Sequence, residues 1–127
     1  MAKMVMVVDD SASIRQVVNF TLRKGGYDVI EASDGVDAMD KLKGLNPLSG
    51  QKVNLIICDV NMPNMDGITF VKNLKTTPNY RFTPVMMFTT ESQDSKIQEG
   101  KAAGAKAWFV KPFKPEQMLD AVSKLIM

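Results

Sequence analysis

Short, mostly apolar runs alternate along the chain with longer segments in which apolar residues recur at helical spacing. Five such runs are present, at residues 4–8, 27–32, 53–58, 84–88 and 107–110. The first run, MVMVV, has no polar face, and this pattern is typical of a strand that is buried on both sides of a parallel sheet. We therefore expect five strands.

A helical pattern follows each run. In the first helix Ser11 or Ser13 is the expected N-cap, and the pair Gly25-Gly26 is the expected end. Segment 92–103 is a weaker, polar helix in which Ile97 is the only large apolar residue. The last helix is the clearest, with a continuous apolar face. The apolar positions of the other four helices are Ile14, Val17, Val18 and Leu22; Val36, Met39 and Leu42; Ile68, Val71 and Leu74; and Met118, Leu119, Val122, Leu125 and Ile126.

Strict alternation of strand and helix predicts an α/β fold, a doubly wound parallel sheet with helices on both faces. We see no internal repeat or linker, so residues 1–127 are expected to form one domain with no output domain after it. No apolar stretch approaches the length of about 20 residues that a membrane helix needs. The single cysteine fits a reducing cytoplasm.

Charge and composition exclude several function classes. The net charge of +2 is too small to indicate a nucleic-acid partner, and the lysines are scattered. The chain contains no histidine, which excludes histidine-based zinc sites, Ser-His-Asp hydrolysis and a histidine phosphodonor. The remaining groups for chemistry are carboxylates, hydroxyls and lysine.

Polar residues of these types stand directly after four of the predicted strands. The first strand ends in Asp9 and Asp10, the third in Asp59, the fourth in Thr89 and the fifth in Lys111. Each residue alone has an ordinary explanation as a turn residue or helix cap. In a parallel sheet, however, all four ends meet at one edge, where such folds bind their ligands. We therefore expect these five side chains to share one site.

Three clustered carboxylates repel one another, so their presence indicates a cation. Oxygen ligands suit Mg²⁺, which takes one or two carboxylates together with waters and phosphate oxygens. A cation there holds a phosphoryl group beside a carboxylate nucleophile, and the sequence therefore predicts phosphorylation of Asp59. Lys111 is expected to pair with a carboxylate or with phosphoryl oxygens, and Thr89 to donate a hydrogen bond to the same oxygens.

At these residues the sequence resembles the receiver domains of two-component response regulators, in particular the single-domain chemotaxis regulators of the CheY type. The matching segments are VVDDS (7–11), ICDVNMPNMDG (57–67), FTTES (88–92) and WFVKPF (108–113). They occur in the order of the family, and the resemblance extends over essentially the whole chain. The resemblance implies a flavodoxin-like, five-stranded sheet in the order 2-1-3-4-5 with five helices, an order of which CheY is itself a standard example.

The resemblance also implies a role for each acidic residue. Asp59 is the expected phosphoacceptor, and Asp9 and Asp10 are similar to the acidic pair of the family. Asp10 and Asp59 are expected to coordinate Mg²⁺ together with the backbone carbonyl of Asn61. Asp9 is expected to act through a water or by orienting the other ligands.

The remaining implied roles concern the response to phosphate. Thr89 and Lys111 are similar to the hydroxyl and lysine that hold the phosphoryl group, while Asn61 and Glu91 occupy positions that tune its hydrolysis. Trp108 stands at the switch position, three residues before the lysine, where the family usually has Tyr or Phe. Because an indole is larger and lacks the phenol hydroxyl, its inward rotation is expected to be partial.

The implied function is a single-domain regulator in the cytoplasm, a monomer that catalyses only its own phosphorylation and dephosphorylation. A CheA-type histidine kinase is the expected donor. The face made by the fourth helix, fifth strand and last helix is expected to bind the flagellar motor switch protein or another phosphorylation-dependent target. A dedicated phosphatase is a further possible partner, whereas nucleic acid and membrane are not expected. The alternatives are a phosphate sink and a receiver outside motility.

Three rivals fit less well. A phosphatase of the haloacid dehalogenase type needs a second Asp two residues after its nucleophile, and here that position is Asn61, which cannot protonate a leaving group. A flavodoxin-like cofactor binder needs a phosphate-cradling loop, but the first strand is followed by the acids of VVDDSAS. A degenerate receiver that only binds proteins has no need of all five site residues.

Overall fold

The structure is a computed structural model that describes residues 3–45, 48, 50–89, 94–110 and 113–126, with the backbone alone for residue 89 and residues 94–97. Within these residues strands and helices alternate without exception, so the α/β class is confirmed. The strands are β1 (Met4–Val8), β2 (Asp28–Ala32), β3 (Leu55–Cys58), β4 (Val85–Thr89) and β5 (Ala107–Val110). The helices are α1 (Ala12–Lys24), α2 (Gly35–Gly44), α3 (Gly67–Lys75), α4 (Asp94–Ala103) and α5 (Pro115–Leu125).

The five strands form one parallel sheet in the order β2-β1-β3-β4-β5, as the resemblance implied. At the centre of the sheet Val8 pairs with Ala32 on one side and with Cys58 on the other. The strands β1 and β3 therefore end level with each other. The residues that follow them, Asp9 and Asp59, emerge side by side at the carboxyl edge.

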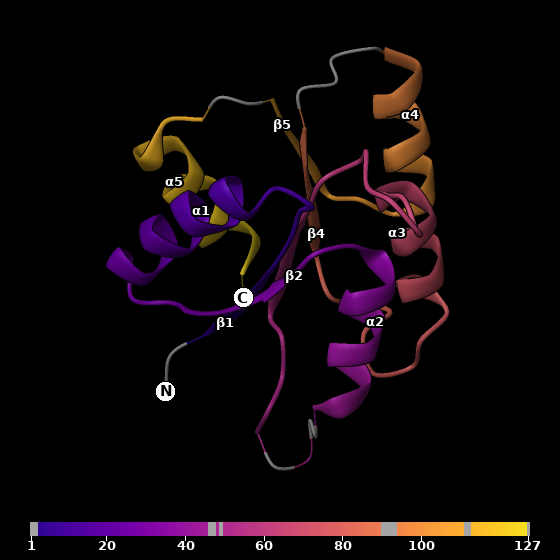
Figure 1. Cartoon of the computed structure of the whole chain (residues 1–127), viewed down its shortest axis with the longest axis horizontal. Helices are drawn as coiled ribbons and strands as arrows, with labels where there is room; N and C mark the ends of the chain where they lie inside the picture. Colours follow the sequence, from indigo (N-terminus) through magenta and orange to yellow (C-terminus); the bar gives the residue numbers. More distant parts are fainter. Residues whose placement is uncertain (1–2, 46–47, 49, 90–93, 111–112, 127) are drawn as a thin grey trace.

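Helices cover both faces of the sheet (Figure 1). Helices α1 and α5 lie on one face, and α2, α3 and α4 lie on the other. Each face has its own hydrophobic core, because alternate residues of the central strands point to opposite sides. Met6, Ile56 and Met87 pack under α2, α3 and α4, whereas Val7 and Ile57 pack under α1 and α5. No described helix is both long and apolar enough to cross a membrane.

The ends of some elements differ from the sequence-based expectation. Strand β3 begins at Leu55 rather than at residue 53. Just before it, the Asn54 N–H donates to the Met4 carbonyl (2.8 Å), and the Asn54 side chain accepts a hydrogen bond from the Met4 N–H (2.9 Å). Strand β4 runs one residue later than expected and includes Thr89. Ser11, not Ser13, caps α1, since its hydroxyl accepts a bond from the Ile14 N–H. The predicted start of α4 at residues 92 and 93 lies outside the described residues.

Candidate functional site

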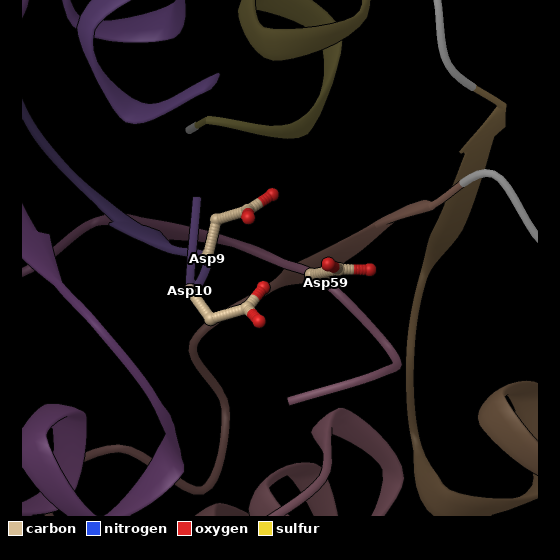
Figure 2. A group of neighbouring side chains, drawn as sticks. All are labelled: Asp9, Asp10 and Asp59. Carbon is tan, nitrogen blue, oxygen red and sulfur yellow. The ribbon is translucent and has the colours of Figure 1, made fainter. Parts of the chain in front are cut away.

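Three carboxylates meet at the carboxyl edge of the sheet, as the sequence predicted. Asp9 and Asp10 follow β1, Asp59 follows β3, and one carboxylate oxygen of each lies within 4.8 Å of the others. Figure 2 shows the three carboxylates projecting to the same side of the sheet edge. Since like charges at this distance repel one another, the cluster is a concentrated negative site.

The three acids differ in their surroundings. Asp9 is 2% exposed and Asp59 is 7% exposed, whereas Asp10 is open to solvent. The Ser11 N–H donates a hydrogen bond to Oδ1 of Asp9 (2.9 Å), and the Arg15 guanidinium donates to the Asp9 backbone carbonyl. These bonds fix the turn between β1 and α1. Asp9 is thus held in place by its own turn, and Asp10 faces the solvent-accessible side of the cluster.

The backbone around Asp59 is tightly constrained. Its N–H donates to the Val8 carbonyl (2.9 Å), which extends the β1–β3 ladder by one residue. The chain then returns at Gly67, whose N–H donates to the Val60 carbonyl (2.8 Å). A Cβ atom on Gly67 would lie only 2.1 Å from the Asp59 carbonyl oxygen. Glycine is therefore required at this position by close backbone approach rather than by dihedral preference.

The sequence analysis did not identify Gly67 as a site residue. A glycine after Asp66 indicates a turn and the start of a helix, and Asp66 does cap α3 through a bond from the Thr69 N–H (2.8 Å). Nothing in the local sequence reveals that the same glycine touches the backbone of Asp59. That contact depends on how the loop folds back onto β3.

Of the other predicted site residues apart from Trp108, the structure describes Asn61 fully and the backbone of Thr89. Asn61 is exposed and lines an open hollow of about 350 Å³ between the β3–α3 loop and the helices α3 and α4. Thr89 is the last residue of β4 and pairs with Val110, so its backbone lies at the carboxyl edge. Glu91 and Lys111 lie outside the described residues, although Lys111 directly follows the partner of Thr89 in the sequence.

Trp108 is half-buried in β5 and packs against the core on the α2, α3 and α4 face. Its ring lies over Gly100 of α4, where a Cβ atom would be 2.7 Å from Cζ3 of the indole. Trp108 thus joins the fifth strand to the fourth helix. Its predicted role as a switch residue stays a prediction.

Cys58 stands next to Asp59 but is a core residue. It is fully buried, and its thiol lies 3.3 Å from the Asp59 carbonyl oxygen as a weak donor. Burial, followed by the charges of Asp59, Asp9 and Asp66, raises the pKa of the Cys58 thiol well above its ordinary value. The thiol therefore stays protonated and unreactive at neutral pH.

Comparison with known proteins identifies the family. The sequence model of the response regulator receiver domain matches residues 5–123. The chain is a response regulator receiver domain. The fold class, the strand order and the acidic cluster at the sheet edge agree with this assignment.

This receiver domain is similar over nearly its whole length to chemotaxis proteins. It is 34% identical to the chemotaxis protein CheY of Bacillus subtilis over 127 residues, which cover 99% of each chain. It is 33% identical to CheY1 of Helicobacter pylori over 122 residues, 95% of this chain and 94% of the relative. Among solved structures, CheY4 of Vibrio cholerae superposes with a TM-score of 0.90 at 44% identity and covers 99% of this chain and 100% of that one.

Membership of the CheY-type receivers implies a role in two-component phosphorelay signalling. Such domains are signalling phosphoacceptors rather than classical enzymes. They bind Mg²⁺ at an acidic pocket, and the donor atoms of this receiver fit that cation: the cluster consists of carboxylate oxygens, two of the three acids are buried, and one is accessible.

Proposed function

We propose that this receiver accepts a phosphoryl group on Asp59, in a Mg²⁺-dependent reaction, from a histidine kinase of the CheA type. The observation that carries the proposal is the convergence of Asp9, Asp10 and Asp59 within 4.8 Å, with Asp59 at the end of the central strand β3. An ionised carboxylate in such a cluster is costly unless a cation offsets the repulsion between the acids. We infer that the cluster is retained for this chemistry.

The transfer uses one oxygen of Asp59 as nucleophile. As this oxygen forms a bond to phosphorus, the bond between phosphorus and the imidazole nitrogen of the donor breaks, and the imidazole keeps the electron pair and takes up a proton. Asp10, Asp59 and the carbonyl of Asn61 are the proposed ligands of the cation, and Asp9 acts through a water or by orienting the other ligands. When bound, Mg²⁺ supplies positive charge that stabilises the phosphoryl oxygens.

Thr89 and Lys111 are proposed to bind the phosphoryl oxygens once the group has been transferred. Thr89 is suited to this by its place at the end of β4, and Lys111 by its position directly after β5. The hydroxyl donates a hydrogen bond, and the ammonium group supplies a charge-assisted one. Asn61 and Glu91 are proposed to tune hydrolysis from the two flanking loops.

The output is proposed to be a change of the face formed by α4, β5 and α5. Phosphorylation biases an existing equilibrium of this face, with Thr89 and Trp108 as the moving side chains, and thereby raises the affinity for a target. Relatives named as chemotaxis proteins favour a target such as the flagellar motor switch. A phosphate sink and a non-motility receiver are the alternatives within this function. A dedicated phosphatase is a further proposed partner, and the proposed location is the cytoplasm.

The test is intact-mass spectrometry after incubation with acetyl phosphate, with and without Mg²⁺. The parent protein is expected to gain one phosphoryl group only when Mg²⁺ is present, and peptide mapping is expected to assign it to Asp59. The variant Asp59→Asn is expected to lose at least nine tenths of the incorporation, because an amide is a poor nucleophile.

The matched control is Asp40→Asn, an Asp on the exposed surface of α2. It should incorporate phosphate at the parent rate. If Asp59→Asn retains the fold and is phosphorylated as fast as the parent protein, Asp59 is not the acceptor and the proposal fails. The proposal also fails if the folded parent protein gains no phosphoryl group when Mg²⁺ is present.

A further inference from the structure

A hydrogen bond joins the loop after Asp59 to the start of α2. The Asn64 side-chain amide donates from Nδ2 to Oδ2 of Asp34 at 2.7 Å. Asp34 is 8% exposed and is the N-cap of α2, where its Oδ1 accepts a bond from the Asp37 N–H (2.8 Å). Each oxygen of the Asp34 carboxylate thus has its own donor, one from the helix and one from the loop.

The backbone at Asn64 is shaped for this contact. Asn64 has a φ of 65°, and no other described residue except glycine has a positive φ. Asparagine tolerates this left-handed conformation better than most residues. The backbone conformation, besides the amide, therefore singles out Asn64 within the loop.

A second contact lies directly beside the first. Met65 packs on Gly35, the first residue of α2, so closely that a Cβ atom on Gly35 would be 2.8 Å from Cβ and Cγ of Met65. Successive loop residues therefore contact successive residues at the start of α2. The loop is attached to that helix by one polar and one apolar contact.

The two ends of the loop are also fixed. It leaves the sheet at Asp59, whose N–H belongs to the β1–β3 ladder, and it ends at Gly67, which touches the Asp59 carbonyl. Asn61 lies between Asp59 and the attachment at Asn64. The position of the Asn61 backbone is therefore set by the sheet on one side and by α2 on the other.

We propose that the hydrogen bond from Asn64 to Asp34 is a positioning contact that sets the cation affinity of the phosphorylation site by holding the Asn61 backbone in place. This inference rests on the proposed function, in which the Asn61 carbonyl is a ligand of Mg²⁺. Neither Asn64 nor Asp34 touches the cation or the phosphoryl group. Outer contacts of this kind commonly change metal affinity by about 10- to 100-fold when they are removed.

The contact can be removed without uncapping the helix. Asp34 keeps its bond from the Asp37 N–H when Asn64 is replaced, and that bond is the largest cause of the lowered pKa of Asp34, ahead of the bond from Asn64. Helix α2 should therefore remain intact. An effect on the metal site then reports the position of the loop and not the loss of a helix.

The test compares two variants by NMR, with MgCl₂ titrated into the unphosphorylated protein and the shifts of backbone amides near Asp59 recorded. Asn64→Gly removes the amide but keeps a residue that adopts positive φ without steric strain. We expect its dissociation constant for Mg²⁺ to rise about tenfold, while the urea midpoint changes little.

The second variant is the exchange Asp34→Asn with Asn64→Asp. The amide introduced at position 34 donates to the carboxylate introduced at position 64, and its oxygen still caps α2, so the contact is restored with donor and acceptor reversed. The net charge of the protein is unchanged. We expect this exchange to bind Mg²⁺ with the parent affinity.

Asn79→Gly is the matched control, because Asn79 is an exposed asparagine in the loop between α3 and β4. The proposal is overturned if Asn64→Gly binds Mg²⁺ like the parent protein, or if the exchange does not recover the affinity that Asn64→Gly loses. Phosphorylation of the parent protein by acetyl phosphate is recorded separately. If the parent protein is not phosphorylated, the proposed function is contradicted. If the Mg²⁺ affinity of Asn64→Gly equals that of the parent protein, only the positioning role is contradicted.

Discussion

Gly67 connects the chemistry of the site to the packing of the backbone. The residue lies so close to Asp59 that even one methyl group would overlap the Asp59 carbonyl oxygen, at 2.1 Å. This oxygen belongs to the backbone directly after the central strand β3, and a backbone atom cannot rotate away as a side chain can. A substitution here must therefore move either the start of α3 or the end of β3.

We predict that Gly67→Ala lowers the free energy of unfolding by about 2–3 kcal/mol, because relief of the overlap requires a backbone shift. Urea denaturation measures this change. Gly44→Ala is the control, since no atom lies within 4 Å of a Cβ placed there, and it should be neutral or stabilise by up to about 1 kcal/mol. Equal effects of the two variants would show that the close approach is absent in solution.

The elements differ in how well the sequence predicts them. Strands β1, β3 and β4 are buried on both faces, so continuous apolar runs identified them, and the face of α5 was equally clear. Helix α4 has a weak apolar pattern, since most of its residues are polar or small, and one of its contacts to the sheet is made by a glycine. The Trp108 ring fills the space at Gly100, and a glycine gives no hydrophobic signal.

The contact between β5 and α4 leads to a prediction at the scale of elements. Gly100→Ala places a methyl group 2.7 Å from the edge of the Trp108 ring and forces the ring away from α4. We expect tryptophan emission to shift to longer wavelength as the ring becomes more exposed, with little loss of stability because alanine favours the helix by about 1 kcal/mol.

Ala102→Ser, on the exposed surface of α4, is the control and should leave the emission unchanged. Trp108 is the only tryptophan of the chain, so the spectrum needs no deconvolution. An emission spectrum of Gly100→Ala identical to that of the parent protein would mean that the indole does not rest on this glycine.

At the scale of the whole molecule, the acidic cluster opposes folding while the two cores favour it. In the unfolded chain Asp59 is far from the neighbouring residues Asp9 and Asp10, whereas in the fold a carboxylate oxygen of each lies within 4.8 Å of the others. Two charges at such a distance repel each other by about 1 kcal/mol where water screens them. A bound cation removes this cost only in the folded protein, so binding and stability are linked.

We predict that Asp10→Asn raises the free energy of unfolding by about 1 kcal/mol when divalent cations are chelated, because one repelling charge is lost. With saturating Mg²⁺, the parent protein should gain more stability than the variant does. Urea denaturation with EDTA and with MgCl₂ provides both values, and Asp40→Asn is the control. A variant less stable than the parent protein in EDTA would contradict the repulsion.

Whole-molecule geometry also explains what the sequence predicted and what it did not. The convergence of Asp9, Asp10 and Asp59 follows from parallel strands alone, so strand ends were sufficient to predict it. The contact of Asn64 with Asp34 and the close approach of Gly67 to Asp59 are different, because each depends on how the loop after β3 folds in space. Their partners are set by loop conformation, for which neither hydrophobic periodicity nor residue type provides a rule.

Because Cys58 is buried, the single thiol of the chain can be used to detect transient opening of the sheet. Its side chain is fully buried in β3, and the raised pKa keeps it protonated, so an alkylating reagent reaches it only in molecules whose central strand is transiently exposed. When closing is fast, the labelling rate gives the equilibrium constant for that opening. Alkylation followed by mass spectrometry thus measures how firmly the sheet is closed one residue from Asp59, in the unmodified sequence and in each ligand state.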